Sequence, residues 1–283
     1  NVKKVEPRRR VYIVFVNDEE IGGADGIQQL VKSKDFEEMN VAFGLDEGLA
    51  SDNDVYKVYY AERVAIWILV EATGPVGHGS AFVKDTATEK IAKLLDKVFK
   101  FRKSQEREMQ LRKKQAGEVI TINLTSMKAG HTKDCGASFT MNVIPSTAQV
   151  GFDIRIPPQV HYKDMEKLIE EEWAPASEGF KVTYVQKGKE NPISDLNGPF
   201  AKVFLETVEK QLQLKTKHMI FHAFTDARMV RAAGVPVIGF SPMINTPILL
   251  HDHNEFLNDK VYIRGVEIYA ALLENLATAN IAN

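Results

Sequence analysis

Val11-Tyr-Ile-Val-Phe-Val16 is a continuous run of β-branched and aromatic residues, the pattern of a strand that is buried on both faces of a parallel sheet. The run ends in Asn17-Asp18-Glu19-Glu20, and a segment with apolar residues at helical spacing follows. A second apolar run, Val41-Ala-Phe-Gly-Leu45, ends in Asp46-Glu47-Gly48. The pattern predicts a β-α-β unit. Its two acidic strand ends are expected to lie close together, because the carboxyl ends of such strands border one ligand crevice.

The middle of the chain has a different pattern. Its predicted strands alternate apolar and polar residues, which indicates a sheet with one covered face. The expected order is β-α-β-β-α-β, with strands near 64–70, 119–124, 150–155 and 181–185 and helices over 89–114 and around 165–169. This order is the split βαβ arrangement.

After Pro199 the buried-strand pattern returns. Helices are expected at 200–213, 226–233 and 260–277, and strands at 218–221, 235–240 and 247–250. The last of these strands ends in His251-Asp252-His253. The simplest division of the chain is an α/β domain formed by residues 1–62 and 185–283, which is interrupted by an α+β domain at 63–184.

Composition excludes several classes of protein. The 283 residues include 36 basic and 38 acidic side chains, so no global basic field is present and we expect no nucleic-acid partner. No apolar run approaches the roughly 18 residues that a membrane span needs, so we expect no membrane association. Cys135 is the single cysteine, which rules out an intrachain disulfide and is compatible with a reducing compartment.

Three apolar runs end in side chains that bind metals, at 18–20, 46–47 and 251–253. One acidic strand end is usually only a solvated turn, but three that converge at one edge of a sheet suggest a metal site. Carboxylate and imidazole groups are ligands for Zn²⁺, and Mn²⁺ and Co²⁺ compete for them. A hydrolytic site also needs a carboxylate that carries protons instead of binding the metal, and adjacent Glu19 and Glu20 suit this division of roles.

These strand ends belong to a longer series of motifs. Over essentially the whole chain the series resembles the M20 family of metal-dependent amidohydrolases and peptidases, and most of all its aminoacylase branch. The motifs are Asn17-Asp-Glu-Glu-Ile-Gly-Gly23, Leu45-Asp-Glu-Gly48, Gly74-Pro-Val-Gly-His78, Asn142-Val-Ile-Pro145, Asp153-Ile-Arg155, Phe224-Thr-Asp-Ala-Arg228, Gly239-Phe-Ser-Pro-Met243 and Leu249-Leu-His-Asp-His253. The resemblance implies an α/β fold with a mixed-sheet, zinc-dependent exopeptidase-like catalytic domain and an inserted α+β ferredoxin-like (βαββαβ) dimerisation domain.

The resemblance also implies an activity, the hydrolysis of N-acyl-L-amino acids to a carboxylate and a free L-amino acid. Two Zn²⁺ ions are expected in each complete active site, with Co²⁺ or Mn²⁺ as alternatives. By motif position Glu19 is the general base and acid, and Glu20, Glu47 and His251 are metal ligands. A homodimer in the cytoplasm is expected.

Two motifs of the inserted domain carry further implied roles. In the family, the position of His78 reaches the active site of the partner subunit and stabilises the oxyanion. Asn142 and Arg155 resemble residues that meet the substrate, and the planar fork of an arginine suits a free α-carboxylate. A structural alternative for Arg155 is a salt bridge with Asp153 on the same face of the strand.

The motif at 224–228 resembles a loop that lines the substrate pocket in the family. The resemblance therefore implies that Thr225, Asp226 and Arg228 contact the substrate. From the residues alone, this stretch is predicted to begin a helix, with Thr225 as the N-cap.

The chain departs from the family pattern in one respect. M20 enzymes carry an upstream His-x-Asp motif and an aspartate that bridges the two metals, and neither motif occurs in this sequence. We therefore expect the chain to be the later part of an enzyme whose catalytic domain is incomplete here. The alternatives are an M20 dipeptidase, a non-catalytic dimerisation or regulatory module, and a site completed by a separate polypeptide.

Overall fold

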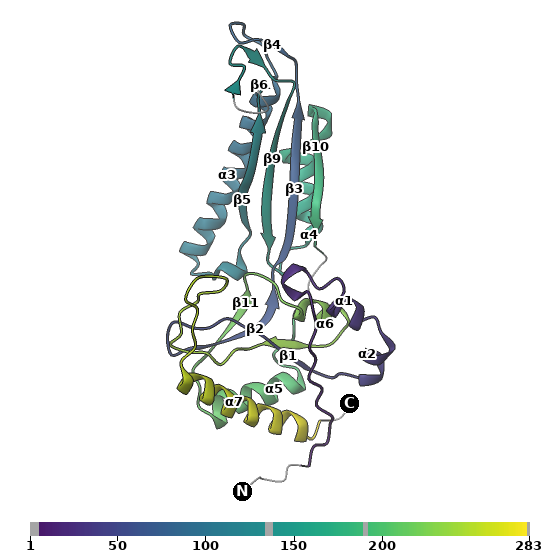
Figure 1. Cartoon of the computed structure of the whole chain (residues 1–283), viewed down its shortest axis with the longest axis vertical. Coiled ribbons are helices and arrows are strands. Elements are labelled where there is room, and N and C mark those ends of the chain that lie inside the picture. The colour runs from purple at the N-terminus through teal and green to yellow at the C-terminus, as the bar shows by residue number, and fades with distance from the viewer. Residues whose placement is uncertain (1–5, 134–137, 189–191, 282–283) are drawn as a thin grey trace. The chain divides into compact units, whose positions relative to one another are not determined.

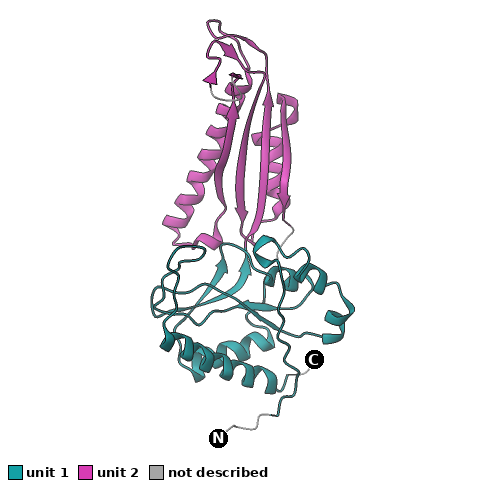
Figure 2. Ribbon diagram, viewed as in Figure 1, with its two compact units in different colours: residues 1–62, 191–283 teal, residues 63–190 magenta. Residues whose placement is uncertain are grey.

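The computed structural model describes residues 6–133, 138–188 and 192–281 (Figure 1). The chain divides into two compact units, which Figure 2 distinguishes by colour. Unit 1 comprises Asn1–Glu62 and Asn191–Asn283, and unit 2 comprises Arg63–Glu190. Cys135 lies outside the described residues. No helix in the described part of the chain combines the length and the apolar composition that a bilayer-spanning helix needs.

Unit 2 is built around a four-stranded antiparallel sheet with the strand order β10-β3-β9-β5. In chain order its main elements are β3 (Val64–Thr73), α3 (Ala87–Leu111), β5 (Thr121–Ala129), β9 (Thr147–Ile156), α4 (Tyr162–Lys167) with its π-helical continuation η4 (Leu168–Trp173), and β10 (Phe180–Lys187). Smaller elements are β4 (Gly77–His78), η2 (Ala116–Glu118), β6 (Thr132–Lys133), β7 (Ser138–Phe139), β8 (Val143–Ile144) and η5 (Ala176–Glu178).

The alternation in β3 and β9 gives this sheet one apolar face. The antiparallel register pairs Ile66 with Ile154 and Ile68 with Phe152, and all four side chains are at most 2% exposed. Because successive side chains of a strand point to opposite faces, these residues share the face that α3 and α4 cover. The sheet and the helices thus enclose a single core.

Helix α3 is specified locally at its start and by packing along its length. Thr86 accepts a hydrogen bond from the backbone N–H of Glu89, and the Glu89 carboxylate accepts one from the backbone N–H of Thr86, which forms a capping box. Ile91, Leu94 and Val98 follow at helical spacing and are each 1% exposed. Burying such a side chain stabilises the fold by roughly 1.5–3 kcal/mol, so packing outweighs the cap.

Unit 1 contains a four-stranded mixed sheet with the strand order β1-β12-β2-β11. Strands β1 and β12 are parallel, as are β2 and β11, whereas β12 and β2 are antiparallel. In chain order the elements are η1 (Glu19–Ile21), α1 (Ile27–Leu30), α2 (Lys34–Met39), β1 (Gly44–Asp46), β2 (Tyr56–Glu62), α5 (Pro199–Leu205) with its π-helical continuation η6 (Glu206–Gln211), β11 (Thr216–Phe221), α6 (Ala227–Ala232), β12 (Val237–Gly239) and α7 (Asp259–Thr278).

Helices α5 and α7 cover the same face of the unit 1 sheet (Figure 1). Phe204 of α5 packs edge-on against Phe240 beyond β12 with ring centroids 5.2 Å apart, and both side chains are fully buried. Ile268 and Leu272 of α7 join the same core. The spacing of apolar residues in the two helices therefore fixes which helix faces meet the sheet.

Two sequence expectations for unit 1 are wrong, and one strand is missing from them. Residues 11–16 form no strand, and Ile13 and Phe15 are 75% and 91% exposed. Residues 247–250 form no strand either. The sequence pattern does not predict strand β2, because buried and half-buried positions do not alternate strictly along Tyr56–Glu62. A strand needs a partner to which it can hydrogen-bond, and an apolar run alone does not supply one.

The two faces of the unit 2 sheet can be compared with one substitution at two sites. Val150 in β9 is fully buried and Val185 in β10 is 60% exposed. We expect Val150→Ala to lower the free energy of unfolding by about 2 kcal/mol through lost burial and a residual cavity, and Val185→Ala to change it by less than about 0.5 kcal/mol. Urea denaturation followed by tryptophan fluorescence measures this unit, because both tryptophans of the chain lie in it. Equal losses would contradict a one-faced core.

Candidate functional site

Carboxylates from three separate segments of unit 1 gather in one place, which we call the acidic cluster: Glu19, Glu20, Asp46, Glu47 and Asp226. Burial, followed by repulsion from neighbouring carboxylates, raises the pKa of three of them, Glu19, Glu47 and Asp226. Burial, followed by the charges of Asp46, Glu19 and Glu20, raises the pKa of Glu47 to about 7. Burial, followed by the charges of Glu19 and Asp46, raises the pKa of Asp226 to about 6. The sequence expectation that the strand ends at Glu19 and Glu47 lie close together therefore agrees with the structure.

Glu19 belongs to the same electrostatic group. Burial raises its pKa above the ordinary value, the charges of Glu20 and Asp46 add to the effect, and Arg228 opposes it. Glu19 lies in the 3₁₀ turn η1, after Asp18 with its left-handed backbone (φ 57°).

A cavity of about 1300 Å³ in unit 1 borders the acidic cluster. Glu19, Asp46, Glu47 and Asp226 line it, together with apolar residues that include Phe36 and Phe43. Both carboxylate oxygens of Asp226 are buried and have no hydrogen-bond partner among the described residues. A buried carboxylate without a partner is costly, so a proton or a cation is needed here.

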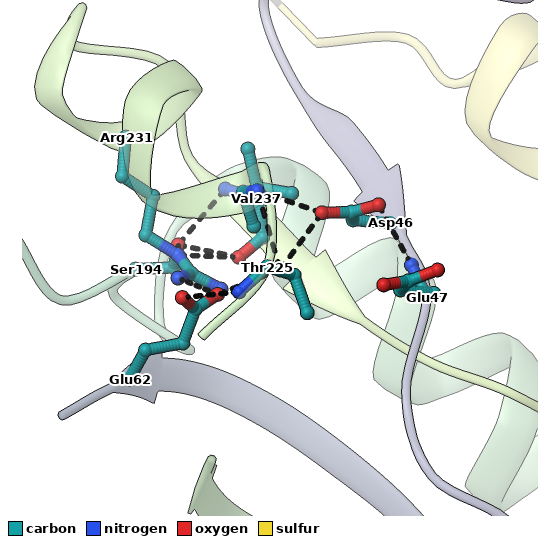
Figure 3. Close-up of polar contacts among 8 residues, drawn as sticks. Asp46, Glu47, Glu62, Ser194, Thr225, Arg231 and Val237 are labelled. Atoms are coloured by element: carbon teal, nitrogen blue, oxygen red, sulfur yellow. Dashed lines mark hydrogen bonds and ion pairs between the residues drawn. The ribbon is translucent and has the colours of Figure 1, made fainter. Parts of the chain in front are cut away.

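The position of Asp46 is fixed by hydrogen bonds from the loop before α6 (Figure 3). The backbone N–H of Ala227 donates to Asp46 Oδ2 over 2.7 Å, and the Thr225 hydroxyl lies 2.9 Å from the same oxygen. The other oxygen, Oδ1, accepts the backbone N–H of Glu47 over 2.9 Å. The Asp46 carboxylate therefore holds the start of the segment that carries Glu47.

Thr225 also contacts a buried glutamate at the end of β2, Glu62. Its backbone N–H donates to Glu62 Oε2 over 2.9 Å, and its hydroxyl lies 2.9 Å from Glu62 Oε1. The hydroxyl thus lies between two carboxylates and has one proton, which is shared between them. Thr225 is not the N-cap that the sequence predicts, because α6 starts at Ala227 with Asp226 in the N-cap position and the Thr225 side chain turns to the two carboxylates instead.

Glu62 is paired with Arg231 of α6. The two side chains are 2% and 1% exposed, and Arg231 Nη1 donates to Glu62 Oε1 over 2.9 Å. Arg231 Nε lies 3.1 Å from the carbonyl oxygen of Val237 and 3.2 Å from Ser194 Oγ. Sequence analysis missed Glu62, Arg231 and Ser194, because a pattern of residue types does not reveal which charged side chains are buried. The overlooked strand β2, which ends at Glu62, was the available signal.

The other predicted ligand, His251, lies near Glu20. Its Nε2 is 3.3 Å from Glu20 Oε2, and the two side chains are 66% and 72% exposed. His251 has a left-handed backbone (φ 58°), which belongs to a turn and not to the end of a strand. The pair is therefore brought together, but it is more open to solvent than Glu47.

The predicted metal ligands can be tested against the chemistry of their donors. No three histidine, cysteine, aspartate or glutamate side chains of the described residues are placed to hold one ion. In kind, however, the donors fit a divalent cation, since carboxylates and an imidazole are suitable ligands and a cation relieves the repulsion within the acidic cluster. The described residues thus contain the donors of a metal site without the finished coordination geometry.

In unit 2 the structure brings His78 and Asn142 together across the short strands β4 and β8. Asn142 Nδ2 lies 3.4 Å from His78 Nε2, and His78 Nδ1 lies 2.7 Å from Ser80 Oγ. The ring is thus contacted at both nitrogens. All three residues are exposed, so the group is accessible to a ligand.

Arg155 forms the salt bridge that was the alternative to substrate binding. Its Nε and Nη2 donate to the two oxygens of Asp153 over 2.7 and 3.0 Å. A bidentate pair of this kind occupies part of the fork that a substrate carboxylate would use. Arg228, the other predicted substrate-binding arginine, stacks its guanidinium 3.8 Å from the centre of the Phe224 ring.

The mixed α/β fold and the acidic cluster agree with the class that the family comparison identifies, the metallopeptidases and related amidohydrolases. The chain belongs to peptidase family M20/M25/M40, whose family model matches residues 1–275. The resemblance seen in the motifs is therefore confirmed, as is the mixed α/β fold. Membership of this family implies a divalent metal ion.

Within the family the chain is similar to aminoacylase-1. It is 40% identical to aminoacylase-1 of Sus scrofa over 272 residues, which cover 95% of this chain and 65% of the relative. It is 41% identical to aminoacylase-1 of Dictyostelium discoideum, with coverage of 95% and 67%. The chain thus spans about two thirds of the length of these relatives.

Solved structures share the fold at low sequence identity. Aminopeptidase PepT from Bacillus cereus superposes with a TM-score of 0.60 at 16% identity, covering 93% of this chain and 63% of that chain. The M20 metallo-carboxypeptidase Sso-CP2 from Sulfolobus solfataricus gives 0.63 at 12% identity, covering 92% and 69%. At such identities the likeness concerns the fold alone.

The raised pKa of Glu47 makes a prediction about metal-free protein. A folded-state pKa near 7, against an ordinary value of 4.5, means that the folded state holds the proton more tightly than the unfolded state. The resulting stability is present below pH 4.5 and is lost as the pH rises towards 7. We expect Glu47→Gln to reduce the loss of unfolding free energy between pH 5 and 7, measured by urea denaturation with circular dichroism. Glu255→Gln, at an exposed site outside the cluster, is the control, and an identical effect there would contradict the prediction.

Proposed function

We propose that the full-length protein hydrolyses N-acyl-L-amino acids to a carboxylate and a free L-amino acid. The observation that carries this proposal is Glu19, a partly buried glutamate with a raised pKa that lies in an acidic cluster beside a cavity. The similarity to aminoacylase-1 supports the substrate class. The protein is proposed to be cytoplasmic.

The proposed catalytic role of Glu19 is proton transfer. In this role its carboxylate takes a proton from the attacking water and later gives it to the departing amine. A raised pKa suits both steps, because a catalyst that exchanges protons works best when its pKa is close to the working pH. Burial and the neighbouring carboxylates supply that shift.

Glu20, Glu47 and His251 are proposed to hold the divalent ions, two Zn²⁺ in the complete site with Co²⁺ or Mn²⁺ as alternatives. What such ions supply when bound is Lewis acidity, which makes water nucleophilic near neutral pH and polarises the acyl carbonyl. Thr225, Asp226 and Arg228 are proposed to line the substrate pocket. The contact of Thr225 with Asp46 supports a place for this loop beside the cluster.

Residues 63–184 are proposed to be an inserted ferredoxin-like dimerisation domain, and residues 1–62 and 185–283 the catalytic domain. The sheet order β10-β3-β9-β5 and the order of elements support the ferredoxin-like assignment. Strand β10 of this sheet continues to Lys187, three residues beyond the proposed boundary. His78 is proposed to act in the site of the partner subunit of a homodimer, and Asn142 and Arg155 to contact the substrate. For Arg155 this requires the Asp153 salt bridge to open or to be shared with the substrate.

The activity is tested on full-length protein with N-acetyl-L-methionine and with a dipeptide that has a free amino terminus. We expect hydrolysis of the N-acetyl compound that is abolished by a chelator and restored by Zn²⁺. Glu19→Gln is expected to lower kcat by roughly 10²–10⁴-fold while the bound metal is retained, and Glu37→Gln, at an exposed acid in α2, is the matched control. Chelator-insensitive cleavage or no cleavage would contradict the proposal, and a preference for the dipeptide would favour the dipeptidase alternative.

The role of His78 across subunits is tested by combining two inactive variants of the full-length protein. Glu19→Gln and His78→Ala are each expected to be inactive as homodimers. In a mixed dimer, one of the two sites receives an intact Glu19 from one subunit and an intact His78 from the other. Half of the dimers formed by random assembly are mixed, so the mixture is expected to show roughly a quarter of the wild-type activity and the isolated mixed dimer roughly half, given two-fold symmetry. Co-expression with two affinity tags isolates the mixed dimer, and a mixed dimer without activity would show that His78 acts within its own subunit.

A further inference from the structure

We propose that Glu62 and Arg231 are positioning residues for the acidic cluster, acting through Thr225, Asp46 and the loop that carries Asp226. The inference rests on the proposed function, since it assigns these residues a part in the same site. Neither residue contacts the proposed catalytic group directly. Their effect is exerted through a continuous series of hydrogen bonds (Figure 3).

The first link in the series runs from α6 to the end of β2. Arg231 donates to Glu62 Oε1, and its Nε reaches the carbonyl oxygen of Val237, the first residue of β12. Ser194 Oγ donates to the same carbonyl over 2.7 Å and accepts the backbone N–H of Val237 over 2.9 Å. The pair is thus fastened to two strands of the sheet as well as to α6.

The second link runs from Glu62 to the loop before α6. Both oxygens of Glu62 accept from Thr225, one from its backbone N–H and one from its hydroxyl. On the far side of Asp226, the backbone N–H of Ala227 is bound to Asp46. The residues on either side of Asp226 are therefore tied to two different strands, which leaves Asp226 little freedom of direction.

The third link runs from Thr225 to the ligand-bearing segment. The Thr225 hydroxyl and the Ala227 N–H both reach Asp46 Oδ2, and Asp46 Oδ1 accepts the backbone N–H of Glu47. A displacement of Thr225 would therefore be transmitted to Glu47. Supporting groups of this kind orient metal-binding residues and influence metal affinity without touching the ion.

Stability alone is a weak reason for such a pair. Removing two charges from water is costly, and well-packed apolar residues of similar volume often replace a buried ion pair with no loss of stability. The Glu62–Arg231 pair is almost completely buried and ends in bonds to the loop beside the cluster. The directions of its hydrogen bonds, which an apolar pair cannot reproduce, explain its presence better than stability does.

The test uses the full-length protein with the double substitution Glu62→Leu/Arg231→Met, which removes both charges together and so avoids leaving one buried charge unpaired. A second variant, Thr225→Val, removes the shared hydroxyl at nearly constant shape. Thr207→Val is the matched control, because Thr207 in η6 is equally buried and its hydroxyl is bonded to the Val203 carbonyl outside this network.

Four quantities are measured for each variant: Tm, kcat and KM for N-acetyl-L-methionine, and the affinity for Co²⁺ added alone to metal-free protein. We expect the double variant and Thr225→Val to lose roughly 10–100-fold in kcat and in Co²⁺ affinity, while KM for the double variant changes by less than about threefold. Thr207→Val is expected to keep both kcat and Co²⁺ affinity.

A purely structural role would be visible as a change in Tm alone. A folded double variant with wild-type kcat and wild-type Co²⁺ affinity would overturn the proposal. If the wild-type protein itself did not hydrolyse N-acetyl-L-methionine, the proposed function would fail. The comparison of Co²⁺ affinities would then decide the positioning role independently.

Discussion

Glu62 is the residue on which the arrangement of the unit 1 site depends. Its carboxylate lies at the end of β2, is almost fully buried, and binds the guanidinium of Arg231 together with the backbone and hydroxyl of Thr225. A charge in such a position is tolerated only when its hydrogen-bonding capacity is used. The requirement to satisfy Glu62 therefore determines where the loop before α6 runs and, through Thr225, how Asp46 is held.

The acidic cluster in the same region has the opposite electrostatic character, because its carboxylates lie beside one another. Burial, and after it the repulsion from neighbouring carboxylates, raises the pKa of Glu19, Glu47 and Asp226. Arg228 relieves only part of this repulsion. Burial also raises the pKa of Glu62, but its carboxylate is paired with the buried guanidinium of Arg231. In the acidic cluster, the repulsion among the carboxylates leaves an affinity for protons or cations. This affinity is what a hydrolytic metal centre uses.

Different interactions determine the structures of the two units. In unit 2, alternating apolar residues of β3 and β9 and the apolar face of α3 form one core. The polar groups of interest are exposed: His78 lies on the short strand β4, and Asn142 lies in the turn before β8. In unit 1, short strands bring together loops from distant parts of the sequence. Packing therefore dominates unit 2, whereas the arrangement of polar groups dominates the site of unit 1.

The sequence by itself determined the features whose cause is local. The period-two pattern of β9 and the capping box of α3 depend on neighbouring residues, and the motifs around Glu19, Glu47 and His251 identified the family. Tertiary structure alone decided which segments find partners. Residues 11–16 have the composition of a strand but form none, because a strand also requires hydrogen-bonding partners that composition does not specify. The tertiary structure also decided that Arg155 bonds to Asp153 and that Glu62 is buried against Arg231. The burial of a charge depends on residues that are remote in the sequence.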